Sequence, residues 1–320
     1  MNNQVPLIET MNLKKYFSTK RGLLHAVDGV NIRIYKGKTL GVVGESGCGK
    51  STLGRTVLRL LEPTGGNILY NGESILNYDN AKMKELRKKM QIIFQDPFTS
   101  LNPRMTVSEI IAEPMKVCQT VNTRAEREDV IDRLMETVGL AERFVNTYPH
   151  ELDGGRRQRI GIARALAVNP EFIVCDEPVS ALDVSIQAQI LNLMMDLQDQ
   201  MGLTYMFITH DLSVIKHISN HIAVMYLGQC VEFAETDELF ENPTHPYTKA
   251  LLNAIPIASL KHKKPLHIIE GEVTSPINPK PGCRFADRCP HATAQCKEGD
   301  INLRELASNH WVSCIKAEKI

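Results

Sequence analysis

Apolar and polar residues alternate over the first 35 residues of the chain, as in HAVDGVNIRI (25–34), and this period of two predicts antiparallel β-strands. Short uninterrupted apolar runs predict buried strands, and apolar residues at helical spacing predict helices. The strand predictions are 39–43, 67–70, 88–95, 172–176 and 203–210, and the helix predictions are 50–62, most of 105–168 and 185–201. Because strands alternate with helices, the pattern favours an α/β fold with a parallel, doubly wound sheet.

The character of the sequence changes near residue 255. SPINPKPG (275–282) is rich in proline, and four of the eight cysteines follow within residues 283–314. We therefore expect one domain over 1–255, with a helical subdomain at about 105–168, and a small cysteine-rich domain over 256–320.

Charge and hydropathy narrow the function classes. The 320 residues include 37 Lys+Arg and 37 Asp+Glu, so the formal net charge is zero, which argues against a nucleic-acid-binding protein. No uninterrupted apolar run approaches the ~18 residues that indicate a membrane span, and the N-terminus lacks the apolar core of a secretory signal. We expect a cytosolic protein whose contact with any membrane is peripheral.

The segment GESGCGKST fits the phosphate-loop pattern G-x-x-x-x-G-K-[ST], and it lies between a predicted strand and a predicted helix, as that motif requires. Its glycines let backbone N–H groups turn towards phosphates, and the helix N-terminus adds partial positive charge. Lys50 would reach the β- and γ-phosphates of a nucleotide, and Ser51 would bind Mg²⁺. The loop comprises Gly44, Glu45, Ser46, Gly47, Cys48, Gly49, Lys50, Ser51 and Thr52, of which we expect Cys48 to be a small buried residue.

Two acidic residues close the strand prediction at 172–176. Asp176 would stand at the carboxyl end of that strand, where ligands bind in open α/β sheets, and it can hold Mg²⁺ through water. Glu177 is placed to polarise an attacking water as a general base. Together with the phosphate loop, this pair predicts that the chain binds and hydrolyses a nucleoside triphosphate.

Over about residues 5–255 the chain resembles the ATPase subunits of ABC transporters, which implies ATP as the nucleotide. The resemblance also implies a P-loop cassette with an N-terminal antiparallel β subdomain. Gln95 matches the Q-loop, which contacts the Mg²⁺ and water site and the coupling helices of the membrane subunits. The other matches are the D-loop, which crosses to the partner cassette (Ser180 and Asp183), the switch histidine at the γ-phosphate (His210), and the aromatic residue that stacks on adenine (Tyr16).

The signature motif of that family, LSGGQ, is matched here by LDGGR, with Leu152, Gly154 and Gly155 in place. Asp153 stands at the serine position and Arg156 at the glutamine position. In the family two cassettes sandwich two ATP molecules, so these residues would face the partner's ATP. A carboxylate cannot donate to a phosphate, and at about 4 Å it repels one by ~1 kcal/mol in water and ~4 kcal/mol at an effective dielectric constant near 20.

We therefore expect two unequal ATP sites in a heterodimer with a second, different ATPase subunit. The alternative is that Asp153 and Arg156 pair with each other and are tolerated.

A narrower resemblance covers the C-terminal part. ENPTHPYTKALLNAIP (241–256) and GCRFADRCP (282–290) are similar to the oligopeptide/dipeptide importers. The resemblance implies a peripheral subunit at the cytoplasmic face of the cell membrane that couples ATP hydrolysis to peptide import. Its implied partners are two transmembrane permease subunits and an external substrate-binding protein. Nickel chelates or another small solute are alternative cargoes.

Cys283, Cys289, Cys296 and Cys314 form the C-terminal cluster. In a reducing cytosol, clustered cysteines indicate a metal site before they indicate disulfides. Four thiolates suit a [4Fe–4S] cluster or Zn²⁺, and spacing without a C-x2-C pair favours the cluster, which some members of the subfamily have. Unligated thiols are the alternative, and we expect His291 and His310 to lie at the surface.

Two other function classes compete with a transport ATPase. A soluble ABC ATPase of DNA repair or translation usually has a coiled-coil insertion or a second cassette, and neither is visible in this sequence. A nucleotide-binding structural subunit that does not hydrolyse ATP would not need Glu177 and His210.

Overall fold

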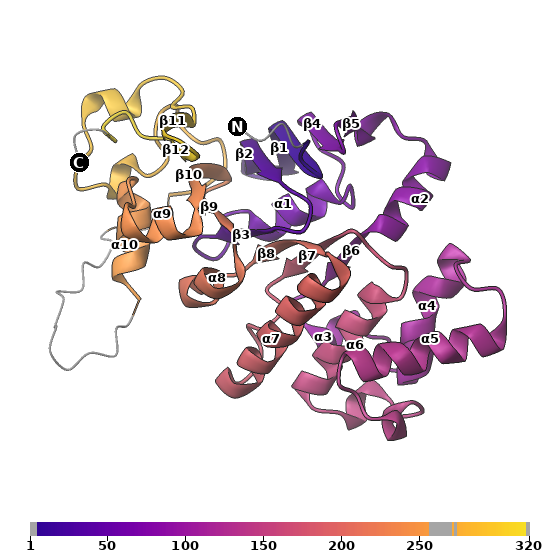
Figure 1. Ribbon diagram of the computed structural model, residues 1–320. Coiled ribbons are helices and arrows are strands. Elements are labelled where there is room, and N and C mark those ends of the chain that lie inside the picture. Colours follow the sequence, from indigo (N-terminus) through magenta and orange to yellow (C-terminus); the bar gives the residue numbers. More distant parts are fainter. Residues whose placement is uncertain (1–4, 256–270, 272–273, 318–320) are drawn as a thin grey trace, which may run out of the picture. The chain divides into compact units, whose positions relative to one another are not determined.

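The computed structural model describes residues 5–255, 271 and 274–317, and these fall into two compact units. The helical unit consists of Tyr35–Lys38 and Ser74–Ile208. The phosphate-loop unit consists of Val5–Ile34, Thr39–Glu73 and the described residues from Thr209 onwards. In Figure 1 most of the helical unit is coloured magenta to red, and the phosphate-loop unit is indigo, violet, orange and yellow.

The phosphate-loop unit has an antiparallel sheet with the strand order β2-β1-β4-β5. Its strands are β1 (Ile8–Thr19), β2 (Gly22–Ile34), β4 (Gly65–Tyr70) and β5 (Glu73–Ser74). Ile8 of β1 is buried and lies opposite Ile34 on one side and Tyr70 on the other. The alternation over the first 35 residues therefore predicted β1 and β2 correctly.

A second group of strands in this unit leads into the phosphate loop. Its strands are β3 (Thr39–Val43), β9 (His221–Tyr226), β10 (Gln229–Glu235), β11 (Arg304–Ala307) and β12 (His310–Val312). β3 is buried throughout and pairs in parallel with β9, and β10 pairs antiparallel with β9. β12 from the C-terminal part pairs with β10, so residues far beyond 255 extend this group of strands.

Four helices belong to the phosphate-loop unit: α1 (Lys50–Val57), α8 (Leu212–Ile218), α9 (Thr236–Glu241) and α10 (Pro246–Asn253). The helix predicted over 50–62 ends five residues early. Arg59 adopts a positive φ of 51°, and the N–H groups of Leu60 and Leu61 both donate to the carbonyl of Arg55. A left-handed residue cannot continue a right-handed helix, so the chain turns there.

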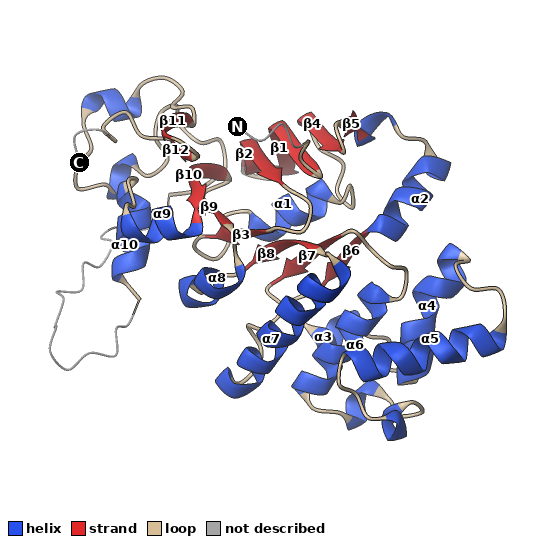
Figure 2. Ribbon diagram, in the orientation of Figure 1, coloured by secondary structure: helices blue, strands red, loops and turns tan. Residues whose placement is uncertain are grey.

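The helical unit contains three parallel strands with helices around them (Figure 2). The strands are β6 (Met90–Ile93), β7 (Phe172–Asp176) and β8 (Thr204–Ile208). The helices are α2 (Asn80–Lys89), α3 (Pro97–Ser100), α4 (Val107–Cys118), α5 (Arg124–Thr137), α6 (Gly154–Leu166) and α7 (Val184–Met201). All residues of β7 and β8 are buried, as their uninterrupted apolar runs predicted.

Side chains at the helix ends fix where several helices of this unit begin and end. Thr106 and Glu109 make reciprocal capping bonds at the start of α4, and Thr123 and Glu126 do the same at α5. α7 ends at Gly202, whose φ of 66° suits the left-handed cap. The sequence did not predict α2, because only two of its residues, Met83 and Leu86, are buried.

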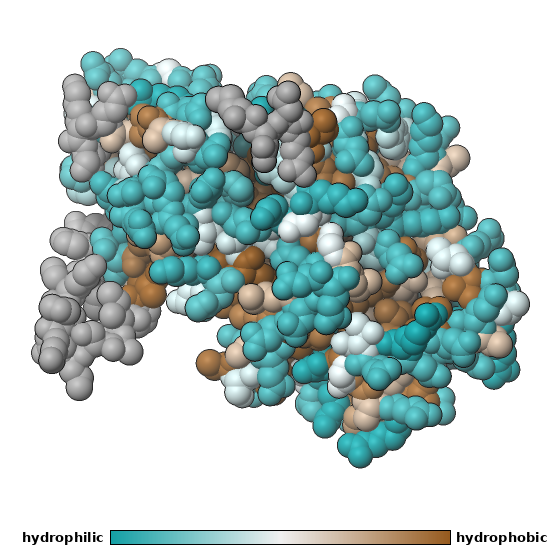
Figure 3. Space-filling view, viewed as in Figure 1, coloured by the Kyte–Doolittle hydropathy of each residue, from teal (hydrophilic) through white to brown (hydrophobic). Residues whose placement is uncertain are grey.

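The surface is mostly polar. Figure 3 shows hydrophilic residues over most of the visible face, with separate hydrophobic patches between them. Phe98, Val117 and Val184 are the most exposed large hydrophobic side chains in the helical unit, at 64%, 64% and 82%. Within the described parts of the chain, every helix is too short or too polar to cross a membrane.

Candidate nucleotide site

The phosphate loop leaves the end of β3 and depends on glycine for its shape. Gly49 has a φ of 104°, and a Cβ there would lie 2.0 Å from the carbonyl oxygen of Ala26. Gly47 has a φ of 77° and no atom within 4 Å of a hypothetical Cβ, so this part of the loop is open. Left-handed turns followed by the first turn of a helix are the backbone arrangement that binds phosphate.

Lys50 begins α1 and is buried, with 4% of its surface exposed. Its Nζ donates to the carbonyl oxygens of Gly44 at 2.8 Å and Glu45 at 3.0 Å, so the lysine fixes the start of its own loop. Cys48 is buried, as the sequence predicted, and burial raises the pKa of its thiol. This thiol therefore stays protonated and acts as a small packing residue.

His210 is exposed and belongs to the phosphate-loop unit. The N–H of Thr209, the residue before it, donates to the carbonyl oxygen of Val42 at 3.1 Å. Val42 lies in β3, two residues before Gly44. His210 therefore follows a backbone contact with the strand that feeds the phosphate loop, which is compatible with its predicted role as the switch histidine.

The acidic pair lies in the helical unit at the end of β7. Asp176 is 1% exposed, and Glu177 adopts a φ of 49°, which is uncommon for a residue other than glycine. Gln95 Nε2 donates to Glu177 Oε2 at 2.9 Å, although 82 positions separate the two residues. The structure thus brings the predicted Q-loop glutamine to the predicted general base, and backbone strain of this kind clusters at functional sites.

The predicted D-loop directly follows this pair. Ser180 Oγ donates to the carbonyl oxygen of Glu177 at 3.1 Å. Gln187 Nε2 donates to the carbonyl oxygens of Val179 at 3.0 Å and Leu182 at 2.9 Å, which holds the loop before α7. Asp183 is the residue before the first turn of α7. These three hydrogen bonds therefore brace the backbone between Glu177 and α7.

The two residues that depart from the signature motif pair with each other. Asp153 caps α6: its Oδ1 accepts from the N–H of Arg156 at 2.8 Å. Arg156 Nη1 donates to Asp153 Oδ2 at 2.5 Å, and both side chains are about half exposed, Arg156 at 44% and Asp153 at 57%. The start of the signature helix therefore has no net charge from this pair, and its first turn is capped by the aspartate.

The three retained signature residues are structurally constrained. Leu152 is buried, with 5% of its surface exposed. A Cβ at Gly155 would lie 2.8 Å from Ile186 Cγ2, and one at Gly154 would lie 3.1 Å from Leu182 Cδ2. Glycine at these positions allows α6 to begin against the D-loop and α7.

Tyr16, the predicted adenine platform, lies in β1 within a polar group that the sequence did not reveal. Its hydroxyl donates to Asp28, and its ring stacks on His25 with 4.0 Å between ring centroids. Burial raises the pKa of Tyr16, so the hydroxyl remains a donor. One ring face thus contacts His25, and stacking of adenine on Tyr16 stays a prediction.

The four C-terminal cysteines, Cys283, Cys289, Cys296 and Cys314, line one cavity together with His245, Phe285 and His291. Burial raises the pKa of the Cys283 thiol to about 11. Among the residues that the structure describes, no three His, Cys, Asp or Glu side chains converge closely enough to hold a single metal ion. The cysteines therefore surround a common space without forming a compact mononuclear site.

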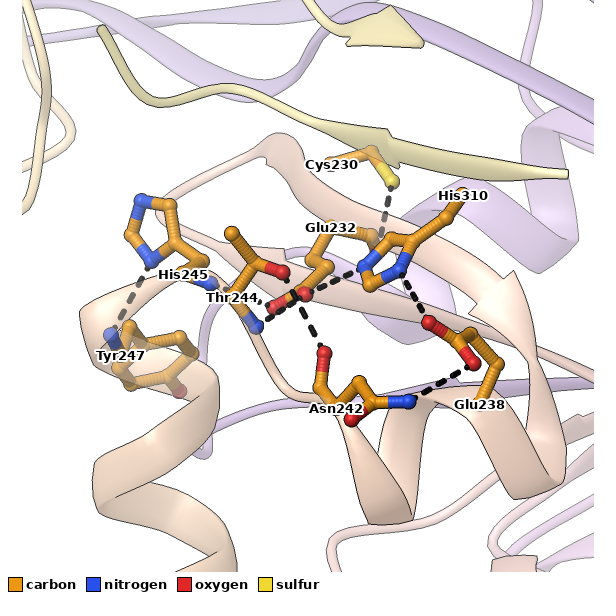
Figure 4. A network of polar contacts seen from close by, with 8 residues as sticks. All are labelled: Cys230, Glu232, Glu238, Asn242, Thr244, His245, Tyr247 and His310. Carbon is orange, nitrogen blue, oxygen red and sulfur yellow. Dashed lines mark hydrogen bonds and ion pairs between the residues drawn. The ribbon is translucent and has the colours of Figure 1, made fainter. Parts of the chain in front are cut away.

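The prediction that His310 lies at the surface is wrong, whereas His291 is exposed as expected. His310 is 3% exposed, and its Nε2 lies 2.8 Å from Oε1 of the fully buried Glu232 (Figure 4). Its Nδ1 lies 3.3 Å from Glu238 Oε1. The hydrogen bond to Glu232 raises the pKa of His310, so the imidazolium form balances a buried carboxylate.

Comparison with known proteins matches two parts of the chain to the two families that it resembles. The family model described as "ABC transporter" matches residues 27–180, and the one described as "Oligopeptide/dipeptide transporter, C-terminal region" matches residues 231–296.

Similar curated proteins span nearly the full length. A putative oligopeptide transport ATP-binding protein of Bacillus subtilis, YkfD, is 51% identical over 314 residues, covering 97% of this chain and 95% of the relative. The oligopeptide transport ATP-binding protein OppF of Salmonella typhimurium is 50% identical over 328 residues, covering 98% and 97%. A solved dimeric ATP-binding cassette bound to ADP and Pi is 28% identical with a TM-score of 0.66, covering 72% of this chain and 98% of that one.

Proposed function

The chain belongs to the ABC transporter ATP-binding family, and from this membership we propose that it is the energy-coupling ATPase subunit of a peptide importer. The observation that supports the cargo most directly is the identity of about half of all residues to oligopeptide and dipeptide transport ATP-binding proteins over nearly the whole length. The match extends through the C-terminal region, which a general ATPase cassette would not require.

The residues present suit Mg²⁺–ATP. The open turn at Gly47 and the N-terminus of α1 provide backbone donors for phosphates, and Lys50 adds positive charge beside them. We assign Mg²⁺ binding to Ser51, Gln95 and Asp176, and the buried carboxylate at the end of β7 is the main reason. Bound Mg²⁺ would neutralise charge on the phosphates.

Glu177 is assigned as the general base that takes a proton from the attacking water. Gln95 donates to its carboxylate at 2.9 Å and so orients it, while the D-loop serine bonds its backbone. His210 is assigned to the γ-phosphate. These residues position and activate water, and the phosphate loop holds the group that is attacked.

We further propose that the protein works as half of a heterodimer with a different ATPase subunit. Asp153 is the reason, because its carboxylate replaces a hydroxyl donor at a site that would face the partner's ATP. The ion pair with Arg156 reduces the expected repulsion, since the pair has no net charge. The two ATP sites would still differ, because Asp153 lacks the hydroxyl donor of serine. In addition, the backbone N–H of Arg156 already donates to Asp153.

A small C-terminal domain with a [4Fe–4S] cluster is part of the proposal. In a tetrahedral Zn²⁺ site with Zn–S bonds of about 2.3 Å, the sulfurs lie only about 3.8 Å apart. In a cluster each thiolate binds its own iron, so the sulfurs stand farther apart around a shared space. The four cysteines line one cavity, and we propose the cluster rather than zinc because their spacing lacks a C-x2-C pair.

The proposed partners are two transmembrane permease subunits and an external substrate-binding protein, with this chain peripheral at the cytoplasmic face. Phe98, three residues after Gln95, is 64% exposed and stacks on the Arg157 guanidinium at 3.5 Å. We propose that this exposed aromatic beside the Q-loop contacts a membrane subunit, as the family resemblance implies for Gln95.

Reconstitution tests this function. The chain would be co-purified with the two permease subunits and the second ATPase, and placed in vesicles with the binding protein. We expect ATP hydrolysis to rise when an oligopeptide is supplied outside. Stimulation by a nickel chelate and not by peptides would contradict the cargo, and hydrolysis that ignores every external solute would contradict the transport role.

A further inference from the structure

The C-terminal part of the chain contacts the phosphate loop directly. Arg288 Nη1 donates to both carboxylate oxygens of Glu45, at 2.9 and 3.2 Å, and to the Tyr226 hydroxyl at 3.3 Å. The Arg288 side chain is 7% exposed and that of Glu45 is 26% exposed. Glu45 is the second residue of the loop, so a carboxylate inside a predicted phosphate-binding segment is neutralised by an arginine 243 positions away.

A second contact holds the backbone of the same residue. The N–H of Glu45 donates to the hydroxyl of Tyr247 at 2.9 Å. Tyr247 lies in α10, is fully buried, and packs against Tyr226 with 4.7 Å between ring centroids. Both the backbone and the side chain of Glu45 are therefore fixed by residues that follow position 225.

The buried network in Figure 4 fixes Tyr247 in turn. Glu232 accepts from the N–H groups of Thr244 at 2.7 Å and His245 at 3.0 Å, and pairs with His310 of β12. His245 Nδ1 then accepts from the N–H of Tyr247 at 3.1 Å, at the first turn of α10. The start of α10 is thus tied to β10 and to the C-terminal strand.

Residues of the same C-terminal part also reach the predicted adenine side. Arg284 donates to Asp28, which accepts the Tyr16 hydroxyl, and to the carbonyl oxygen of Leu227. Asn278 bonds the backbone of Leu23 through both its N–H and its side chain, at 2.9 Å each. The contacts therefore occur at both ends of the predicted nucleotide site of this unit.

We propose that Arg288 is a positioning residue for ATP: it neutralises Glu45 and holds the phosphate loop in its binding shape. This inference rests on the proposed function, and it assigns a role in nucleotide affinity to a residue of the C-terminal part. The physical reason is electrostatic. Without Arg288, the Glu45 carboxylate leaves a negative charge within a loop that must accept the negative charges of a triphosphate.

A charge effect and a packing effect of Arg288 predict different changes in ATP affinity. Arg288→Gln should weaken ATP binding about fivefold, because one uncompensated charge near the surface has an effect of that order. Arg288→Lys, which keeps the charge, should recover most of the affinity. The double variant Arg288→Gln with Glu45→Gln should return to within about twofold of the unmodified protein, since the loop is again uncharged at this point.

The experiment measures equilibrium binding of Mg²⁺–ATP to the full chain by titration calorimetry, with thermal unfolding of each nucleotide-free variant as the check on folding. Lys297→Gln is the matched control, because Lys297 pairs with Asp287 on the exposed surface of the same region, 2.8 Å apart. That control should bind ATP like the unmodified chain.

Unchanged affinity in folded Arg288→Gln would overturn the proposal. A double variant as weak as the single one would also overturn it, because it would show a role in packing only. If Arg288→Gln does not fold, the variant Glu45→Gln decides, because it removes the negative charge from the loop. This variant should bind ATP at least as tightly as the unmodified chain. Weaker binding would contradict the proposal. An unmodified chain that binds no ATP would instead contradict the proposed function.

Discussion

Asp153 and Arg156 allow the charge at the start of the signature helix to be varied in both directions. The native pair has no net charge, because Arg156 Nη1 lies 2.5 Å from Asp153 Oδ2. Arg156→Gln leaves a net negative charge there, Asp153→Ser leaves a net positive one, and the double variant is neutral again. Serine is also a good N-cap residue, so α6 should stay capped in all four proteins.

The size of the effect follows from exposure and distance. Both side chains are about half exposed, so screening is close to that of water, and one unbalanced charge about 4 Å from a phosphate changes the binding energy by ~1 kcal/mol. This corresponds to about fivefold in affinity. We expect the partner's site to bind ATP about fivefold more tightly in the Asp153→Ser complex than in the native complex. In the Arg156→Gln complex it should bind ATP about fivefold more weakly.

The assay is a titration of the assembled transporter with a fluorescent ATP analogue, under conditions that block hydrolysis and resolve two affinities. The double variant separates charge from hydrogen bonding, because it changes only the available donors. Equal affinities for Asp153→Ser and Arg156→Gln would refute the electrostatic reasoning. Two equal, tight sites in the native complex would contradict the asymmetric heterodimer and favour a tolerated ion pair.

Two further predictions concern the C-terminal part. Burial lowers the pKa of His245 to about 4 from its ordinary 6.5, so between these pH values the unfolded chain binds a proton that the folded chain does not, and stability falls as the pH falls. His245→Asn keeps an acceptor for the Tyr247 N–H but cannot bind a proton in this pH range. The difference in unfolding free energy between pH 7 and pH 4 should therefore be roughly 3 kcal/mol smaller in this variant than in the native chain. An unchanged pH profile would contradict the assignment. Anaerobic purification should give a brown protein that contains iron and sulfide. Replacing Cys283 and Cys296 by serine should abolish the colour. Zinc alone, or no metal at all, would contradict the cluster.

The sequence predicted the elements that have a strong local pattern. β1 and β2 alternate, β3, β7 and β8 are mostly apolar and buried throughout, and α7 has helical spacing and a terminal glycine. Each pattern reports burial on a known face, so each element followed from local chemistry. α2 was missed because it buries only two residues, and its start depends on Asp79, whose side chain accepts from the N–H of Lys82.

The candidate site was predictable where a motif fixes spacing. The phosphate loop, Asp176 and Glu177 are local motifs, and the pairing of Asp153 with Arg156 follows from their separation of three residues at a helix start. The contacts of Arg284 with Asp28 and Arg288 with Glu45 join residues more than 240 positions apart. Such contacts leave no periodic signal in the sequence. Each arginine stands next to a cysteine, and the sequence of this segment predicted only a metal site.

The role of Glu177 as the general base is tested most directly by ATP turnover in the assembled transporter with Glu177→Gln. We expect this variant to bind ATP as tightly as the native protein and to lose most peptide-stimulated hydrolysis, because the amide cannot take a proton from water. Glu171→Gln is the matched control, because Glu171 directly precedes β7, the strand that Glu177 follows, and pairs with Lys89 at 3.1 Å. The transporter with this variant should hydrolyse ATP normally. Near-native turnover in Glu177→Gln would contradict the claim that this chain hydrolyses ATP with Glu177 as its base.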